Sequence, residues 1–393
     1  MKNNKIAFVV QRYGEEVNGG AELLCRQLAE KMIANYPNIE VLTTKAIDYT
    51  TWANEYPGNL ETINGVAVRR FPVAKERSQK EFDNINGLFM AGQLAKEREV
   101  EWIEKQGPYA PELVQYIKDH KEDYDLFVFF TYLYYPTVIG IKEVKEKAIL
   151  VPHAHDEPFL KMEEYQNLFK SPRAFFLNTD EEKEMLQGKF DIDVPIDIGG
   201  VGIDLPESID GSRFKEKYQL DDYIVYVGRI DEGKNCHILF KYFKEFKKRN
   251  QGSLKLVLMG KPAMPIPKDN DIVSLGFVSE QDKYDGIKGA KILVLPSEFE
   301  SLSMVVLEAM SVGTPVLVYG KCPVLKGHCL KSNGALYYNN YFEYEAAVNF
   351  LMDNPEKVAT MKLNAKKYVD DNYQWDVITG RLDRLMERVM EVD

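Results

Sequence analysis

The sequence predicts an α/β protein with two doubly wound, parallel-sheet domains that face a central cleft. Short apolar runs alternate with amphipathic helical stretches, which is typical of parallel sheets covered by helices on both faces. The alternation restarts after a segment rich in glycine and proline, PIDIGGVGIDLPE at 195–207. In addition, 393 residues exceed the usual size of a single hydrophobic core.

The first predicted domain spans residues 1–200. Its first unit is a strand, KIAFVV, then a helix that begins near Gly20, then the strand IEVLTT. The helix is apolar at Leu23, Leu24, Leu28 and Met32, which is the spacing of one buried helical face. Three later runs, DLFVFF, KAILVPH and AFFLNT, predict further strands, and the charged region 75–105 predicts a helical insertion.

The second predicted domain spans residues 201–372. Five apolar runs predict its strands: YIVYVGR, LKLVLMG, DIVSLGF, KILVLPS and TPVLVYG. A last helix is predicted over 373–393, where apolar residues recur at helical spacing. Two open sheets that meet at the carboxyl ends of their strands create a ligand-binding cleft.

Composition excludes some classes of protein. A net charge of −11 argues against a general nucleic-acid binder, because binding to phosphate backbones needs a basic surface. The four cysteines show no CxxC spacing, which favours reduced thiols and a cytoplasmic location. The most apolar run, 125–141, is interrupted by Pro136 and is too short to span a membrane, so we expect no transmembrane segment.

The segment EFESLSMVVLEAMSVG, at 299–314, carries two carboxylates in an apolar context. Ser301 or Ser303 is expected to cap the helix and Gly313 to end it, which places Glu300 in the loop and Glu308 inside the helix. An unpaired buried carboxylate costs several kcal/mol, so Glu308 needs a partner. Either a ribose diol or a structural ion pair with an arginine would meet that need.

The segment YVGRIDEGKN, at 226–235, ends a strand and presents two cations. Arg229 can bind phosphate oxygens in bidentate fashion, and Lys234 adds a point charge. Both are expected at the edge of the sheet where the helix of Glu308 begins. The alternative is a solvated loop with ordinary surface charges.

The segment QRYGEEVNGGAE contains Gly14, Gly19 and Gly20 between a strand and a helix. It matches neither the dinucleotide fingerprint nor the P-loop, which requires Lys and then Ser or Thr after the second glycine. A loop that lets a ligand approach the backbone at a helix N-terminus, or a plain turn, accounts for it.

The segment LVPHAHDEP, at 150–158, places His153 and His155 at a strand end, just before Asp156. A metal site would need more histidine ligands than the chain offers at matching positions. A histidine that contacts substrate, or a hydrogen-bonded structural one, explains the pattern better.

Together these motifs resemble the retaining family-four glycosyltransferases of the GT-B fold, the glycosyl transferases group 1. VGRIDEGKN is followed by LVLPSEFESLSMVVLEAMSVGTPVL, which carries the family's pair of glutamates with seven residues between them. GGAE, AHDEP and GGVGID also match the family in the same order. The resemblance covers the whole chain and is most specific across 224–318.

The resemblance implies a set of site residues. The catalytic pair would be His155 and Glu300, both beside the transferred sugar. The donor-binding residues would be Gly19, Gly20, Arg229, Lys234, Val278, Leu302, Ser303 and Glu308.

Within that set, the resemblance implies that Arg229 and Lys234 hold the donor diphosphate, helped by the backbone of Leu302 and Ser303. Glu308 would bind the ribose hydroxyls. The family commonly has Phe-Gly where this chain has Leu302 and Ser303, and a Gly-x-Gly-Pro turn where it has MGKPAMPIP.

The remaining assignments concern the base, the first domain and the last helix. Val278 would contact the base through its backbone, and Gly19 or Gly20 would face the phosphate or the acceptor. The first domain would bind the acceptor and the second the nucleotide sugar. The final helix, from about Trp375, would cross back onto the first domain.

The predicted function is therefore transfer of a hexosyl group from a UDP- or GDP-sugar to an acceptor hydroxyl in bacterial glycan, polysaccharide or glycoconjugate synthesis. Retention and independence of metal and other cofactors are expected, since fixed positive charge can stabilise the leaving diphosphate. The acceptor would be a glycan or be linked to lipid or protein, and peripheral membrane contact stays open. The alternatives are a non-catalytic GT-B-like binding subunit, a phosphorylase or epimerase, and a metal-dependent hydrolase.

Overall fold

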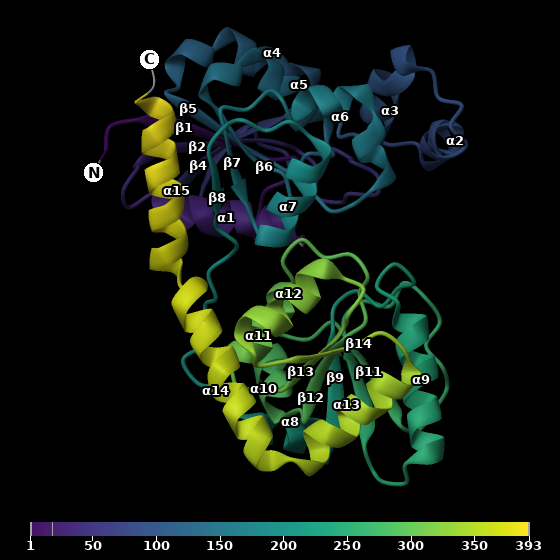
Figure 1. Cartoon of the computed structure of the whole chain (residues 1–393). Coiled ribbons are helices and arrows are strands. Elements are labelled where there is room, and N and C mark those ends of the chain that lie inside the picture. The colour runs from purple at the N-terminus through teal and green to yellow at the C-terminus, as the bar shows by residue number, and fades with distance from the viewer. Residues whose placement is uncertain (1, 18, 392–393) are drawn as a thin grey trace. The chain divides into compact units, whose positions relative to one another are not determined.

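The computed structural model describes residues 2–17 and 19–391, and it divides into two compact units (Figure 1). The first unit comprises Met1–Gly200 together with Ile378–Asp393, and the second comprises Val201–Val377. The expected domain boundary lay after residue 200 and the expected last helix began at 373. In the structure the chain passes from the second unit to the first within that helix.

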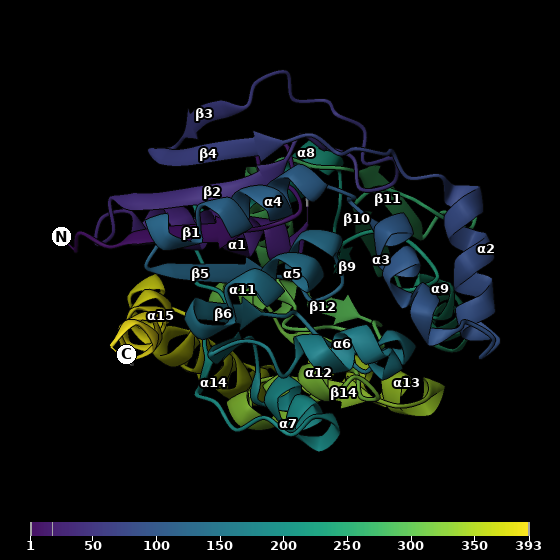
Figure 2. The ribbon, with the colours of Figure 1, turned by 90° about the horizontal axis from the view of Figure 1, so that it is seen from above.

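The described part of the first unit contains one sheet of eight strands. Its order places the fifth strand beside the first, so the chain switches direction across the sheet between them (Figure 2). In sheet order the strands are β3 (Leu60–Ile63), β4 (Val66–Phe71), β2 (Asn38–Thr44), β1 (Lys5–Val9), β5 (Leu126–Phe130), β6 (Ala148–Val151), β7 (Ala174–Leu177) and β8 (Ile196–Ile198).

All neighbouring strands of this sheet run parallel except β3 and β4, which pair antiparallel. The turn between them is Asn64-Gly65, and both residues have positive φ, 48° and 85°. This is the backbone that a two-residue hairpin turn requires, and Asn-Gly is its typical sequence. The prediction of strands in the first domain missed this hairpin, although the dipeptide signals it.

Helices cover both faces of the first sheet. One face forms a core in which Val9, Phe129 and Leu150 pack with the helical residues Trp102 and Leu113. The α-helices of this unit are α1 (Gly20–Met32), α2 (Gln79–Met90), α3 (Glu99–Gln106), α4 (Pro111–Asp119), α5 (Tyr135–Gly140), α6 (Glu163–Leu168), α7 (Asp180–Lys189) and, from Ile378 onward, α15 (Trp375–Met390). Short 3-10 turns occur at Lys96–Arg98, Lys121–Asp123, Ile141–Glu143, Lys145–Lys147 and Pro158–Lys161.

Helix α15 is attached to the first unit by polar contacts. Asp383 accepts hydrogen bonds from the Tyr36 hydroxyl at 2.6 Å and from the Lys2 ammonium at 2.6 Å. Lys2 also pairs with Glu387 at 2.7 Å, and Arg381 donates to the Ile198 carbonyl at 3.0 Å. The last helix therefore completes the first unit.

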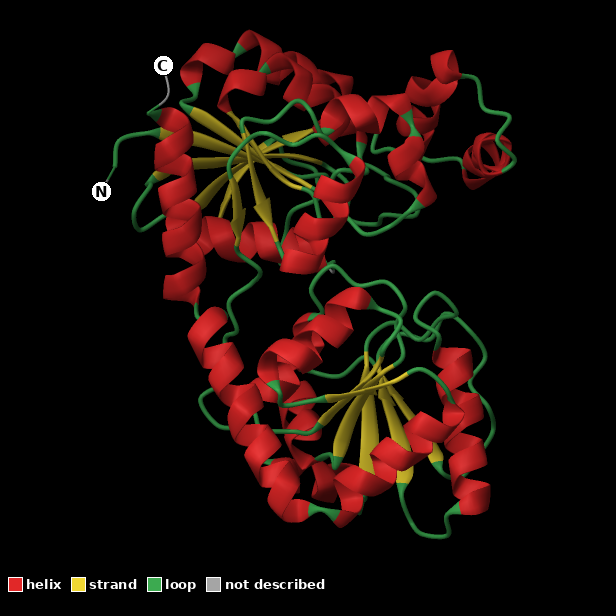
Figure 3. Ribbon diagram, viewed as in Figure 1, coloured by secondary structure: helices red, strands yellow, loops and turns green. Residues whose placement is uncertain are grey.

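In the second unit, the described residues contain a sheet of six strands whose pairings are all parallel, with helices on both sides (Figure 3). In sheet order they are β11 (Ile272–Gly276), β10 (Lys255–Met259), β9 (Tyr223–Val227), β12 (Ile292–Leu295), β13 (Val316–Tyr319) and β14 (Leu336–Tyr338). Counted within the unit this is the order 3-2-1-4-5-6 of dinucleotide-binding folds. The strand order reverses between β9 and β12, and such a switch point is where these sheets bind ligands.

The helices of the second unit connect these strands in order. They are α8 (Gly211–Tyr218), α9 (Cys236–Arg249), α10 (Glu280–Gly289), α11 (Met304–Ser311), α12 (Pro323–Ser332), α13 (Tyr341–Asp353) and α14 (Pro355–Asn372). The glycine after α11, Gly313, has φ 74° and its N–H bonds to the Met310 carbonyl at 3.2 Å, as expected for a helix C-terminus.

The four cysteines are buried, and none of these described residues forms a disulfide. Burial raises the pKa of the Cys322 thiol to about 11 and that of Cys329 to about 12. Across residues 2–17 and 19–391, no helix has the length and apolar character needed to cross a membrane.

Candidate donor-binding and active site

The switch point of the second sheet begins with two glycines in close contact. Gly228 follows β9 and Gly260 follows β10, and both have strongly positive φ values, 145° and 150°. A Cβ atom on Gly260 would lie 1.8 Å from the Gly228 carbonyl oxygen. Only glycine fits at position 260. The close contact of the two glycines fixes where the loop that carries Arg229 and Lys234 leaves the sheet.

Asp231 organises that loop. Its carboxylate accepts a hydrogen bond from the Arg229 guanidinium and another from the backbone N–H of Lys234 at 2.8 Å. The Arg229 side chain remains 53% exposed, so its guanidinium is within reach of a ligand. The sequence analysis did not single out Asp231, although it lies inside the quoted motif.

Lys234 and Glu300 meet across the switch point. The Lys234 ammonium lies 2.7 Å from Oε1 of Glu300, which joins the loop after β9 to the loop after β12. The sequence assigned these residues to different parts of a donor, and the structure holds them in one ion pair. An ammonium has three donors, so this bond leaves Lys234 able to contact a phosphate as well.

Ser303 occupies the N-cap position of α11, but it does not cap the helix as predicted. Its backbone is left-handed, with φ 69° and ψ 79°, and its side chain makes no capping hydrogen bond. The hydroxyl is buried and has no hydrogen-bond partner among the described residues. A non-glycine residue in this conformation costs about 1–2 kcal/mol, which explains why glycine is common at this position in the family.

The Leu302 carbonyl next to Ser303 is fixed by a buried histidine. His328 of α12 donates from Nε2 to that carbonyl at 2.7 Å, and its Nδ1 lies 3.0 Å from the Tyr368 hydroxyl of α14. The backbone that precedes α11 is therefore tied to two other helices. The backbone N–H groups at the start of α11 form the positive end of the helix dipole.

Glu308 is not the unpaired carboxylate that the sequence suggested. Its side chain is buried, and Oε1 accepts from the Lys283 ammonium at 2.8 Å and from the Tyr284 hydroxyl at 3.3 Å. Within the described residues no protein group donates to Oε2. The charge is compensated by a lysine where an arginine was considered, and one oxygen remains for a ligand.

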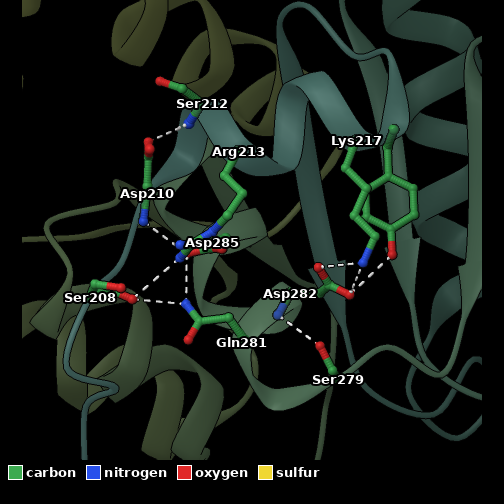
Figure 4. A network of polar contacts seen from close by, with 10 residues as sticks. Ser208, Asp210, Ser212, Arg213, Lys217, Ser279, Gln281, Asp282 and Asp285 are labelled. Carbon is green, nitrogen blue, oxygen red and sulfur yellow. Dashed lines mark hydrogen bonds and ion pairs between the residues drawn. The ribbon is translucent and has the colours of Figure 1, made fainter.

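Both partners of Glu308 come from α10, which a polar network holds in place (Figure 4). Asp285, which is 1% exposed, accepts from Arg213 of α8 at 2.6 and 2.9 Å and from the backbone N–H of Asp210 at 2.8 Å. Asp282 pairs with Lys217 of α8 at 2.7 Å. The network therefore fixes the helix from which Lys283 and Tyr284 reach Glu308.

Val278 lies at the start of the same helix. Ser279 is the N-cap of α10 and accepts from the Asp282 N–H at 3.1 Å, so Val278 immediately precedes the cap. Val278 is half-buried, and its neighbour Phe277 is 79% exposed. The predicted base contact and the predicted ribose contact thus share one supporting element.

In the first unit, the two candidate glycines differ. A Cβ on Gly19 would lie 2.2 Å from Oε2 of Glu22, whose Oε1 accepts from Arg12 at 2.9 and 2.6 Å. Gly19 therefore makes room for a buried ion pair of its own unit. A Cβ on Gly20 would meet no atom within 4 Å, so Gly20 borders open space at the start of α1.

The two histidines after β6 also differ. His153 is buried and accepts at Nδ1 from the Asn178 amide at 2.9 Å, and burial lowers its pKa to about 4. His155 lies with Nε2 3.0 Å from Oε1 of Glu157, and the Tyr132 hydroxyl donates to the other oxygen of Glu157. Burial alone would lower the pKa of His155, but the hydrogen bond and charge of Glu157, together with the His153 backbone and the Glu182 carboxylate, raise it.

These contacts show what the sequence analysis missed. It did not identify Glu157, which lies inside the quoted segment 150–158, or Lys283 and Tyr284, which lie six and seven residues after DIVSLGF. Among the residues that the structure describes, no group of three or more histidine, cysteine, aspartate or glutamate side chains is arranged to hold a metal ion. A groove of about 800 Å³ along α9, next to Met264 and Tyr341, contains none of the predicted site residues.

Known proteins resemble the chain in sequence and in fold. Residues 209–368, most of the second unit, match the family "Glycosyl transferases group 1". Over 99% of both chains, the protein is 24% identical to an uncharacterized glycosyltransferase of Methanocaldococcus jannaschii.

Two solved structures share the fold over nearly the whole length. Sucrose-phosphate synthase from Thermosynechococcus elongatus superposes with a TM-score of 0.74 at 15% identity and 100% coverage of both chains. HepE of Anabaena, solved in complex with UDP-glucose, gives a TM-score of 0.69 at 16% identity, covering 98% of this chain and 100% of HepE. The second unit therefore matches the group 1 glycosyltransferases in sequence, and the whole chain has the GT-B fold of these solved structures.

Proposed function

We propose that the protein transfers a hexosyl group from a UDP-sugar to an acceptor hydroxyl, with retention and without a metal ion. The observation that carries the proposal is the convergence of Arg229, Lys234, Glu300 and the start of α11 at the switch point of the second sheet. UDP is preferred to GDP because HepE, a structural neighbour, was solved with UDP-glucose. Retention follows the family that the motifs resemble.

The phosphate end of the donor is the part that the chemistry needs most. Breaking the bond to the sugar leaves extra negative charge on the diphosphate, so fixed positive charge lowers the barrier. Arg229 and Lys234 supply two cations, and the N–H groups at the start of α11 supply a partial positive charge. The buried Ser303 hydroxyl would add one more donor to a phosphate oxygen.

The sugar and ribose would use the two glutamates. Glu300 is oriented by Lys234, so its carboxylate can accept from a hydroxyl of the transferred hexose. Glu308 would accept a ribose hydroxyl at Oε2, while Lys283 and Tyr284 hold Oε1. His155 and Gly20 would contribute from the first unit, beside the transferred sugar and the acceptor.

The test is donor turnover by the purified chain. We expect measurable binding of UDP and slow hydrolysis of UDP-glucose, unaffected by a chelator. Arg229→Ala should lower kcat by about 100-fold or more, because one donor to a developing anion is lost. Arg249→Ala is the matched control, since Arg249 is a half-exposed residue of the same unit that pairs with Glu345 at 3.0 Å.

The outcomes separate the remaining functions. Near-normal turnover by Arg229→Ala would contradict the proposed role of the second unit. Tight binding of UDP-glucose with neither hydrolysis nor transfer would identify a non-catalytic binding subunit. Preference for GDP-mannose over UDP-glucose would keep the reaction and change the donor.

A further inference from the structure

The first unit contains a half-buried arginine without an acidic partner. Arg77 donates from Nη2 to the Oε1 of Gln106 at 3.2 Å, and its guanidinium lies 4.2 Å from the ring centre of Phe82. Its Nε is buried without any hydrogen-bond acceptor among the described residues. No carboxylate in the described chain forms an ion pair with it; Asp83, in the first turns of α2, bonds instead to Gln79 at 2.7 Å.

Aromatic residues surround this guanidinium. Trp52 donates from its indole N–H to the Gln106 carbonyl at 2.8 Å, so Gln106 links Trp52 to Arg77. The Tyr134 ring packs edge-on against Trp52 at 5.4 Å. The Tyr134 hydroxyl lies near enough to Arg77 and Arg12 for both cations to act on its pKa, which burial raises.

The cluster lies at the switch point of the first sheet. Its strand order reverses between β1 and β5, and Arg12 follows β1 whereas Tyr134 follows β5. Across that point Thr131 donates to the side-chain oxygen of Gln11 at 2.8 Å, so the two strand ends are in contact. Ligands of open parallel sheets bind at this position.

The cluster contains two arginines, Arg12 and Arg77, although the whole chain is acidic. Arg12 is neutralised by Glu22, which it contacts through two nitrogens. Arg77, by contrast, forms no ion pair within the described residues, and Asp83 acts on it only from a distance. Burial lowers its pKa, but an arginine stays protonated at all ordinary pH values, so the charge persists and favours an anionic ligand.

We propose that Arg77 binds an anionic group of the acceptor, a phosphate or a carboxylate, with the half-buried Tyr134 contacting the sugar that carries it while the buried Trp52 supports Tyr134 from the core. The proposal rests on the proposed function, because it assigns the first unit to the acceptor of that reaction. A guanidinium matches the geometry of both anions, and aromatic faces suit a sugar ring. The proposal restricts the acceptor to a negatively charged saccharide.

Three hexose probes test it with the full chain saturated in UDP, which occupies the diphosphate site. The probes are glucose 6-phosphate, glucuronate and neutral glucose, with binding measured by calorimetry. We expect at least one charged probe to bind 10-fold or more tightly than glucose. Arg77→Gln should abolish that preference and Arg77→Lys should keep part of it, while both keep the wild-type thermal unfolding curve.

The control variant is Arg98→Gln, because Arg98 is an exposed arginine near α3 that pairs with Glu101 at 2.8 Å. It should bind all three probes as the wild type does. Equal or undetectable binding of the three hexoses would overturn the proposal, and so would a charge preference that survives in Arg77→Gln. Comparison of the two charged probes then decides between phosphate and carboxylate.

A parallel titration in Arg229→Ala separates this proposal from the donor site. If UDP does not bind the wild type, the proposed function fails on that result alone. A charge preference that depends on Arg77 and persists in Arg229→Ala would still locate an anion site on the first unit.

Discussion

The Glu157 carboxylate accepts a hydrogen bond from the Tyr132 hydroxyl with one oxygen and contacts the His155 imidazole with the other. The raised pKa of His155 means that the folded state favours the imidazolium. The interaction of the His155 imidazolium with Glu157 therefore stabilises the fold fully below the unfolded pKa of histidine, about 6.5. This stabilisation is lost as pH rises through the higher pKa of the folded state.

Glu157→Gln should lower the pKa of His155, because burial then acts without the opposing carboxylate. An NMR titration of the imidazole protons measures the pKa directly, and the alkaline limb of the rate profile should shift to lower pH. Asp156→Asn is the control, since Asp156 pairs with Lys189 at 2.9 Å instead. An unchanged His155 pKa in Glu157→Gln would contradict the assignment.

The contrast between Glu308 and Ser303 shows how far residues could be predicted. Burial of Glu308 followed from its apolar neighbours, and so did its need for a partner. The partner could not be named, because Lys283 lies 25 positions earlier and only the packing of α10 on α11 brings them together. The left-handed backbone of Ser303 could not be predicted for a similar reason. The hydrogen bond from His328 fixes the Leu302 carbonyl and with it the loop conformation, which outweighs the preference of serine for negative φ.

Between elements, the Lys283–Glu308 pair links α10 to α11 in a mostly buried setting. Lys283→Met should lower the free energy of unfolding by about 3 kcal/mol, because it leaves a buried carboxylate without its cation. It should also weaken UDP binding more than binding of 2′-deoxy-UDP, if Glu308 holds the ribose as proposed, since Lys283 orients that carboxylate. Urea unfolding and calorimetry measure the two effects.

Lys291→Met provides the comparison, because Lys291 is an exposed lysine that pairs with Asp222 at 3.2 Å at the far end of β12. Its effect on both measurements should be small, as for surface ion pairs generally. If Lys283→Met and Lys291→Met behaved alike, Glu308 would not depend on Lys283.

Elements were predicted best where the pattern is strong and local. The helix from Gly20 and the helix after the loop of Glu300 lie where the apolar spacing and glycine signals put them. The β3–β4 hairpin was missed because its strands are short and β3 is almost wholly exposed, so it lacks the apolar run that marked the others. The Asn-Gly turn was the signal that remained.

On the scale of the whole molecule, α15 returns the chain to its first unit through Asp383. Burial alone would raise the pKa of this carboxyl, but the bonds from Lys2 and Tyr36 lower it. The resulting stability is present above the unfolded pKa of about 4 and is lost as pH falls through the folded pKa.

Asp383→Ala should destabilise the first unit by about 1–2 kcal/mol and leave the second unchanged, because two hydrogen bonds to one carboxylate are removed. Hydrogen exchange resolved by segment measures both units in one sample. Glu391→Ala, an exposed position on the same terminal segment, should alter neither. Equal destabilisation of both units would contradict the attachment of α15 to the first.

The fold as a whole was predictable because the alternation of strands and helices occurs twice and is interrupted once. The proposed acceptor site was not predictable, since Arg77, Gln106 and Tyr134 belong to no contiguous motif. They are 29 and 28 positions apart in the chain, and Arg77 and Gln106 meet only because α3 returns to the loop that follows β4. A sequence shows each residue type, but it does not show which cation lacks an anion.

The buried cysteines have a practical consequence for measuring motion. With a pKa of about 11, roughly one in 10⁴ Cys322 thiols is ionised at pH 7, and its burial further slows attack on a maleimide. The native thiols can therefore stay in place while a dye pair is attached to cysteines introduced at the exposed residues Met90 and Phe342, one on each unit. Energy transfer between those dyes, recorded with and without UDP, would report any movement of one unit relative to the other in a chain that keeps its natural core.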